Sequence, residues 1–275
     1  MSFLQLKNKT FLIIGLFNKK SIAYHAAQCL VEEGAKCIYV VKDITVKEKV
    51  EQFISDAYIF VCDVENQDEI ATLYQDISEI YSKIDGMLHS IAFANFSEGL
   101  KPFHETKKKD FLQAIDVSCY SLVNLANAFK GLLDINASVV TLSVPFIKIA
   151  VENYGFMAPV KAALESSVVY LAQSFSKFSN IRFNIVSANV LKTSSAAGVP
   201  EYMKLALHAE SLTFRKKSIE TKEVADIIAF LLSSRSSAIN GQTVIADAGM
   251  SVNTYDKGIM DIFYQKKLNP NHNSL

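Results

Sequence analysis

The segment Asn153–Lys161, which reads NYGFMAPVK, holds a tyrosine and a lysine that could act together on a substrate. Tyr154 and Lys161 lie seven positions apart. In a helix, seven positions turn the chain by about 700°, so the two side chains project from nearly the same face, roughly 10 Å apart along the axis. A phenol can donate a hydrogen bond to a developing oxyanion, and a neighbouring ammonium lowers the pKa of the phenol. The alternative is structural: a tyrosine at a helix start and a lysine on a solvated face.

The elements that must position this pair alternate between strand and helix along the whole chain. Short runs that are apolar on both faces predict parallel strands, and longer amphipathic runs predict the helices that cover the sheet. The predicted strands are 10–15, 36–41, 57–62, 84–93, 137–143, 181–187 and 241–247. The predicted helices are 21–34, about 46–53, 67–81, about 108–133, about 154–178 and 221–233, with a less regular stretch at 189–217.

This alternation predicts an α/β fold: a Rossmann-type, doubly wound, seven-stranded parallel sheet with helices on both faces. No Pro-, Gly- or Ser-rich linker divides the sequence, so residues 1–275 are predicted to form a single domain, with a polar tail at about 264–275 that we expect to be frayed. Pro159 is expected in the first turn of its helix, where a missing N–H group is tolerated.

Composition excludes several function classes. Lys plus Arg and Asp plus Glu number 28 each, so the formal net charge is zero and gives no electrostatic reason to expect a nucleic-acid or membrane partner. No apolar run reaches the ~20 residues that span a bilayer, and the first residues lack a signal-peptide pattern. The four cysteines form no C-x-x-C pair and have no histidine at zinc-ligand spacing, so no metal site is predicted. We therefore expect a reduced, cytoplasmic protein.

A nucleotide site is expected at the carboxyl ends of the strands, where open α/β sheets bind ligands. Gly15 leaves the first strand and Ser21 opens the following helix, whose N-terminus offers N–H groups to a phosphate. This loop has one glycine, whereas the dinucleotide fingerprint has three, so alone it is a weak indication. Asp63, after the third strand, could accept a hydrogen bond from an adenine amino group or could cap a turn. Lys42, after the second strand, could pair with a 2′-phosphate or could be a solvated loop lysine.

Six segments in fixed order carry a resemblance to a known family: GLFNKKSIAY (15–24), CDV (62–64), IDGMLHSIAFA (84–94), NYGFMAPVKAALES (153–166), SANVLKT (187–193) and DAG (247–249). Together they resemble the bacterial enoyl-acyl-carrier-protein reductases, a divergent branch of the short-chain dehydrogenase/reductase family, over about Leu4–Val252. The most specific feature is the Ser-Ile-Ala-Tyr run combined with a tyrosine and a lysine that six residues separate, because ordinary short-chain dehydrogenases separate theirs by three.

The resemblance implies an activity and a set of partners. The reaction is the reduction of a trans-2-enoyl thioester, carried by acyl-carrier protein, in fatty-acid elongation. The hydride comes from NADH, with NADPH possible. Tyr154 would donate to the thioester oxygen as negative charge builds there, and Lys161 would hold the ribose hydroxyls of the nicotinamide half. Members of the family are usually homotetramers, with the two longest helices and the last strand buried between subunits.

The resemblance also implies positions for the site, to which the sequence adds Lys42. The expected cofactor-binding residues are Gly15, Ser21, Ile22, Lys42, Asp63, Val64, Ser90, Ile91, Ala92, Lys161, Leu191 and Thr193. The expected substrate-binding residues are Phe93, Ala94, Val144, Tyr154, Met157, Ala196, Val199, Tyr202 and Leu205, with a substrate lid at about 191–215.

Four positions depart from the family pattern. His25 replaces the third loop glycine, Phe17 stands where a small residue is usual, and Asn189 falls in the segment that usually reads SAGP. Val144 stands where an aromatic residue normally lines the acyl pocket. Two further hypotheses therefore remain open: a related enzyme that reduces another carbonyl substrate, and a catalytically impaired nucleotide-binding protein.

Overall fold

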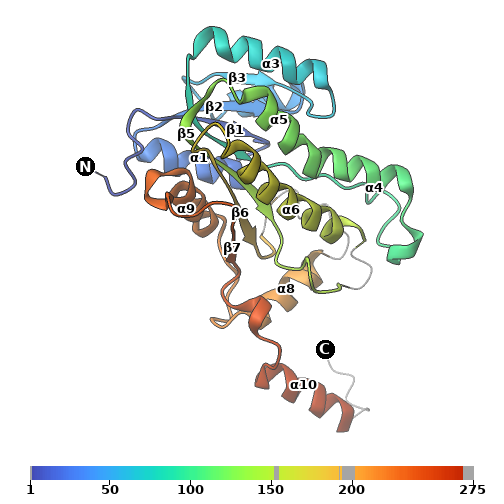
Figure 1. Cartoon of the computed structure of the whole chain (residues 1–275). Coiled ribbons are helices and arrows are strands. Elements are labelled where there is room, and N and C mark those ends of the chain that lie inside the picture. The colour runs from blue at the N-terminus through green and yellow to red at the C-terminus, as the bar shows by residue number, and fades with distance from the viewer. Residues whose placement is uncertain (1, 152–154, 192, 194–201, 269–275) are drawn as a thin grey trace.

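A seven-stranded sheet in the order β3-β2-β1-β4-β5-β6-β7 forms the centre of the computed structural model (Figure 1). The structure describes residues 2–151, 155–191, 193 and 202–268. Every neighbouring pair of strands is parallel. The strands are β1 Thr10–Ile14, β2 Lys36–Val41, β3 Ile59–Val61, β4 Ile84–His89, β5 Leu133–Ser143, β6 Arg182–Ala188 and β7 Thr243–Ala246. This confirms the predicted fold class, and it places the point where the strand order reverses between β1 and β4.

Helices cover both faces of the sheet (Figure 1). One face carries α1 Ile22–Glu32, α2 Ile44–Glu51 and α9 Thr221–Leu232. The other carries α3 Gln67–Ile80, α4 Lys108–Ile115, α5 Ser121–Phe129 and α6 Met157–Phe175. Two more helices, α8 Tyr202–Leu212 and α10 Lys257–Leu268, lie away from these two layers. Among the described residues, no helix is both long and apolar enough to cross a membrane.

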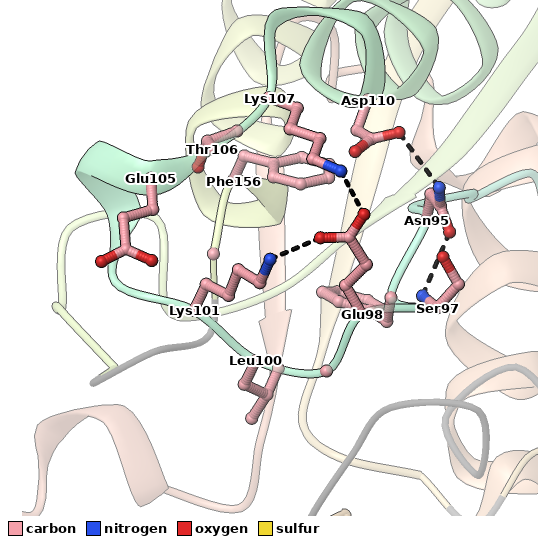
Figure 2. Close-up of a pocket in the computed structure, with 13 residues that line it drawn as sticks. Asn95, Ser97, Glu98, Leu100, Lys101, Glu105, Thr106, Lys107, Asp110 and Phe156 are labelled. Carbon is pink, nitrogen blue, oxygen red and sulfur yellow. Dashed lines mark hydrogen bonds and ion pairs between the residues drawn. The ribbon is translucent and has the colours of Figure 1, made fainter.

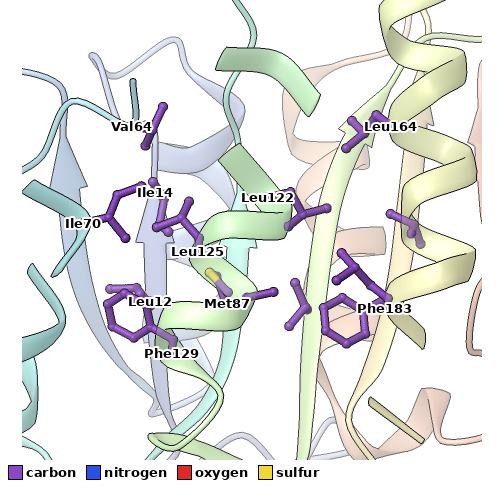
Figure 3. Packing of buried hydrophobic residues seen from close by; sticks show 14 of the residues in the cluster. Leu12, Ile14, Val64, Ile70, Met87, Leu122, Leu125, Phe129, Leu164 and Phe183 are labelled. Carbon is purple, nitrogen blue, oxygen red and sulfur yellow. The ribbon is translucent and has the colours of Figure 1, made fainter. Parts of the chain in front are cut away.

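The core is split by the sheet into two layers, because successive side chains of a strand point to opposite faces. On β1, Leu12 and Ile14 belong to one hydrophobic cluster, while Phe11 and Ile13 belong to the other. Figure 3 shows the first cluster, where side chains of α5 pack on the sheet. Burial on both faces explains why the strands read as continuous apolar runs in the sequence.

The largest local difference from the sequence prediction is in the stretch expected to be one helix at 108–133. It consists of α4, a π turn at Asp116–Tyr120 and α5, and β5 then begins at Leu133 rather than at 137. A π turn holds one residue more than an α-helical turn, and an apolar pattern does not reveal that extra residue.

Other parts of the prediction differ from the structure as well. The strand expected at 84–93 ends at His89, and the stretch 189–217 expected to be irregular contains α8. The expectation of a frayed tail from 264 was wrong for residues 264–268, which belong to α10; residues 269–275 lie outside the described part of the chain. The α10 residues have no buried side chains, so the polar composition of this segment correctly indicated exposure but not the backbone conformation.

Candidate active site

An open pocket enclosing about 1050 Å³ lies at the carboxyl edge of the sheet, at the point where the strand order reverses. Its walls come from four strand exits and three other segments. They are Gly15 after β1; Ser90–Ala92 after β4; Leu142–Val144 and Phe146 at the end of β5; Ala188–Leu191 and Thr193 at the end of β6; Phe17, Ser21 and Ile22 around the start of α1; Lys161 on α6; and Tyr202 and Leu205 on α8. The mostly apolar lining with a few polar groups suits a small organic ligand.

Most of the residues predicted from the sequence meet in this pocket. It is lined by Gly15, Ser21, Ile22, Ser90, Ile91, Ala92, Val144, Lys161, Leu191, Thr193, Tyr202 and Leu205. Tyr154, Ala196 and Val199 lie outside the described residues.

Six predicted residues do not line this pocket. Met157 and Val64 are buried in the hydrophobic core, and Ala94 packs against it, so these three side chains belong to the core packing. Phe93 turns toward Lys42, whose Nζ atom lies 5.9 Å from the centre of the ring. Asp63 pairs with the same lysine. Lys42 and Asp63, which were both predicted to bind the adenosine end of the cofactor, therefore form a polar cluster separate from this pocket.

Among the described residues that line the pocket, Lys161 alone carries a charged side chain, and it is only 3% exposed. Its Nζ atom donates to the carbonyl oxygens of Leu142 at 2.9 Å and Ile91 at 3.3 Å, so it joins the exits of β5 and β4. An ammonium carries three donors, and these bonds use two of them. Burial lowers the pKa of Lys161 to about 8, against a smaller opposing effect of Cys119 and Glu165.

The start of α1 provides the features that a phosphate needs. The N–H groups of Tyr24 and His25 donate to the Ser21 carbonyl, so the N–H groups of Ile22 and Ala23 precede the first bonds within the helix. Ser21 and Ile22 line the pocket, which therefore receives the positive end of the helix dipole.

Gly15, between β1 and this helix, has a φ angle of +94°. A Cβ atom at this position would lie 2.3 Å from the carbonyl oxygen of Ser90. The glycine is therefore required by the close approach of the β1 and β4 exits, both of which line the pocket.

The departures in the nucleotide loop are accommodated locally. The His25 ring is half-buried and packs edge-to-face on Tyr24 with 5.6 Å between ring centres, while α1 approaches the sheet through Ala23, Ala26 and Ala27. The imidazole therefore does not separate the helix from the strand. Phe17 lines the pocket with its side chain about half exposed.

Asn189, the third departure, is buried at the end of β6. Its side-chain oxygen accepts a bond from the N–H of Val190 at 2.7 Å, and its own N–H donates to Ala246 of β7. The asparagine thus stabilises the strand exit, and its replacement of the usual small residue leaves the backbone in the sheet register.

The apolar end of the pocket includes an aromatic side chain that the sequence analysis missed. Phe146 lines the pocket and packs with Val144, Ala209 and Met250 in a small hydrophobic cluster. The signal was present in the sequence, since the run LSVPF places an aromatic residue two positions after Val144. This wall of the pocket therefore still has an aromatic ring, although residue 144 itself is a valine.

The α8 helix is tied to the pocket through Tyr202. Its hydroxyl donates to the carbonyl oxygen of Leu191 at 2.9 Å, which fastens the start of α8 to the exit of β6. This bond uses the hydroxyl proton, so Tyr202 offers a ligand its ring and a hydroxyl oxygen that can only accept.

A buried polar network beneath Lys161 was also missed. His89, fully buried at the end of β4, contacts the Thr141 hydroxyl at 2.9 Å through Nδ1 and the Ser121 hydroxyl at 2.8 Å through Nε2. Ser118 accepts from the N–H of Phe93 at 2.8 Å and donates to its carbonyl at 3.0 Å. The π turn supplies Ser118 and leads into Ser121, so it is the element that holds the exit of β4.

His89 should make the protein less stable below neutral pH. Burial, and then the charge of Lys161, lower the pKa of His89 from 6.5 to about 3, so the unfolded chain takes up a proton that the folded chain refuses. Its contribution is complete above pH 6.5 and declines as the pH falls toward 3. Urea unfolding at pH 7 and pH 5 should differ by about 2 kcal/mol from this group alone. In His89→Gln this difference should disappear; an unchanged difference would contradict the assignment.

A second, smaller pocket of about 440 Å³ lies between the β4–α4 loop and the segment after Tyr154 (Figure 2). Glu98 bonds Lys101 and Lys107, and these bonds lower the pKa of Glu98 to about 2. Asn95 donates to Asp110 at 3.0 Å. Two ion pairs and one hydrogen bond therefore hold the loop together and against the start of α4.

Phe156 connects this loop to the segment that carries Tyr154. Its ring stacks on Phe96 with 6.2 Å between centres and packs edge-to-face on Phe111 at 6.1 Å. The loop and the start of α6 thus share a packed aromatic cluster, and Gly155 faces the smaller pocket. In the part of the chain that the structure describes, no group of three or more His, Cys, Asp or Glu side chains could hold a metal ion.

Comparisons with known proteins agree with this geometry. Residues 15–251 match the family model described as enoyl-(acyl carrier protein) reductase. The chain is 34% identical over 251 residues to the NADPH enoyl-acyl-carrier-protein reductase of Staphylococcus aureus, covering 90% of this chain and 98% of that protein. It is 31% identical over 251 residues to the NADH enzyme of Escherichia coli, covering 90% and 95%. The solved structure of the NADH enzyme from Aquifex aeolicus superposes with a TM-score of 0.86 at 30% identity, covering 91% of this chain and 99% of that chain. The chain belongs to the enoyl-acyl-carrier-protein reductase family.

Proposed function

We propose that this protein reduces trans-2-enoyl thioesters to acyl thioesters in fatty-acid elongation, using Lys161 and Tyr154. The assignment of the site rests on the pocket at the point where the strand order reverses. In this pocket, Lys161 bonds the exits of β4 and β5, and the N-terminus of α1 forms part of the lining. Family membership supports the reaction class.

The pocket fits a nicotinamide dinucleotide. When bound, NADH or NADPH supplies the hydride. The N-terminus of α1 would hold the pyrophosphate, because its N–H groups and dipole favour an anion. Lys161 has one donor beyond its two backbone bonds, and this donor would hold the ribose hydroxyls.

Tyr154 would act on the substrate. Addition of hydride to the carbon–carbon double bond places negative charge on the thioester oxygen, and a donor already aimed at this oxygen lowers the barrier. A phenol is such a donor, and the positive charge of Lys161 would lower the pKa of the phenol and favour the enolate. Since Tyr154 lies outside the described residues, this role rests on its match to the family motif.

The apolar end of the pocket would receive the acyl chain. Val144, Phe146, Val190 and Leu205 line it, and α8 lies in the stretch 191–215 that is expected to act as a lid. The bond of Tyr202 to Leu191 would hold the start of α8 close to the pocket. The thioester would arrive on acyl-carrier protein, as the names of the relatives state for those enzymes.

A homotetramer is part of the proposal. Leu112, Tyr120, Val169 and Tyr170 are exposed on α4, the π turn and α6, which lie next to one another on one face of the sheet. Burial of these side chains between subunits would remove apolar surface from water. Light scattering of the purified protein gives the subunit number directly, and a monomer would contradict this part of the proposal.

The activity is tested by mixing the folded protein with NADH or NADPH and enoyl thioesters from crotonyl upward, and by following loss of the reduced cofactor. Tyr154→Phe should lower kcat by about a hundredfold or more while nucleotide affinity stays the same, since the lost donor acts on the transition state. A full rate in this variant would exclude the role of Tyr154. If no thioester is reduced but a ketone is, the substrate assignment is wrong. If neither nucleotide binds, the protein is not a reductase.

A further inference from the structure

The polar cluster at the adenine end of the sheet is not explained by the proposed reaction. Lys42 follows β2, and in doubly wound folds an acidic or basic side chain in this region decides between the ribose hydroxyl of NADH and the 2′-phosphate of NADPH. Its Nζ atom lies 3.2 Å from Oδ2 of Asp63 and 3.7 Å from Oε2 of Glu65. The centre of the Phe93 ring lies 5.9 Å from the same Nζ atom. The lysine thus already has two carboxylate partners.

Further carboxylates surround this group. Glu69 accepts from the N–H of Asp63 at 2.7 Å. Burial and then the charge of Glu65 raise the pKa of Asp116, so Glu65 and Asp116 lie close enough to repel. Asp43, next to Lys42, uses its side chain to cap α2. The described contacts thus place Lys42 beside more carboxylates than it can neutralise, and we expect this group of side chains to repel an anion.

We propose that Lys42 neutralises Asp63 and Glu65 instead of binding a 2′-phosphate, so that this site selects NADH over NADPH. The inference rests on the proposed function, since it concerns the cofactor of that reaction. A 2′-phosphate carries up to two negative charges and would have to displace two carboxylates from Lys42 while remaining beside them. A 2′-hydroxyl carries no charge and can donate a hydrogen bond to a carboxylate.

Family membership does not decide this question. Of the relatives compared above, the enzyme of Staphylococcus aureus is named for NADPH and that of Escherichia coli for NADH, at similar identity to this chain. Lys42 alone would favour NADPH, because a free basic residue after β2 is suited to a 2′-phosphate. The two ion pairs reverse this expectation.

Binding is measured without turnover by titrating the full-length protein with NADH and NADPH and following nicotinamide fluorescence. The chain has no tryptophan, so protein emission interferes little. NADH should bind at least about tenfold more tightly than NADPH, which corresponds to about 1.4 kcal/mol. Glu65→Gln should tighten NADPH binding by about threefold to tenfold and leave the Kd of NADH nearly the same, because one of the repelling charges is removed.

Two controls separate this electrostatic effect from others. Glu79→Gln removes an exposed carboxylate from the far end of α3, about 20 Å along the helix from its start, and should change neither Kd. Added salt screens repulsion, so the preference for NADH should narrow as ionic strength rises. If Lys42 instead attracts the 2′-phosphate, added salt would weaken NADPH binding relative to NADH.

The outcomes distinguish the two proposals. Binding of both nucleotides with NADPH as tight as or tighter than NADH overturns the inference about Lys42 and leaves the proposed function standing. Unchanged NADPH affinity in Glu65→Gln also overturns it. Binding of neither nucleotide to the folded protein overturns the proposed function, and the inference about Lys42 falls with it.

Discussion

Lys161→Met should lower kcat/KM for enoyl-thioester reduction by about a thousandfold. The methionine keeps a long, flexible apolar side chain, but it removes the charge and all three donors. The pocket then loses the only charged side chain among its described lining residues. Both nucleotide affinity and kcat should fall, since Lys161 is proposed to hold the ribose and to favour the enolate. Fluorescence titration and steady-state kinetics measure the two effects separately.

Loss of function through misfolding is the competing explanation, and Lys161→Arg addresses it. In the methionine variant the carbonyl oxygens of Ile91 and Leu142 lose a buried donor, which costs about 1–3 kcal/mol of stability. Arginine restores charge and donors. The pKa of Lys161 is about 8, so the ammonium and the rate of the native enzyme should decline above that pH. In a folded Lys161→Arg variant the loss of rate at alkaline pH should move to higher pH. If the rate still falls near pH 8, a group other than Lys161 causes the decline.

Gly15→Ala should give the largest loss of stability among single substitutions at the site, about 3 kcal/mol or more. The added Cβ atom would lie 2.3 Å from the Ser90 carbonyl oxygen, and a backbone oxygen cannot move aside as a flexible side chain can. The positive φ angle adds strain for any residue other than glycine. Relief would require the exits of β1 and β4 to separate, which would change the shape of the pocket that both line. We therefore expect weaker nucleotide binding together with a lower midpoint of urea unfolding.

Gly131→Ala is the matched control. A Cβ atom at Gly131 would meet only the Tyr74 hydroxyl, at 3.8 Å, and this glycine does not have a positive φ angle. Its substitution should leave stability and binding close to those of the native protein. Equal losses of stability in Gly15→Ala and Gly131→Ala would show that replacing any loop glycine destabilises the protein. The close contact between Gly15 and Ser90 would then not explain the result.

The sequence predicted the strands well because they are apolar on both faces, a pattern that few other elements produce. It placed the Lys161 pocket through strand exits, since parallel strands bring their carboxyl ends to one edge. It did not reveal which lysines would be buried or paired. The family resemblance predicted that Lys161 belongs to the site. Its burial and its two bonds could not be predicted, because the carbonyl groups that accept them lie 19 and 70 positions away in the chain. The ion pairs of Lys42 and the position of Phe146 likewise depend on tertiary packing.

The residues expected at the adenine end illustrate the limit most clearly. Asp63 and Lys42 were each assigned a ligand, because each follows a strand at the correct edge. Because β2 and β3 are neighbours, the two residues just past their ends come together and have each other as partners. A sequence read one position at a time cannot show that two candidate ligand groups neutralise one another.

The π turn between α4 and α5 has a consequence for how this chain can tolerate changes in length. Such a turn is one residue longer than an α-helical turn, so deleting a residue there would give an ordinary continuous helix. Every residue before the deletion would then rotate by about 100° relative to those after it. If the deleted residue is Cys119 or Tyr120, which lie between Ser118 and Ser121, these two serines could no longer both face the end of β4 and the segment after it. Such a deletion would leave helix content intact and release the strand exit that holds Lys161.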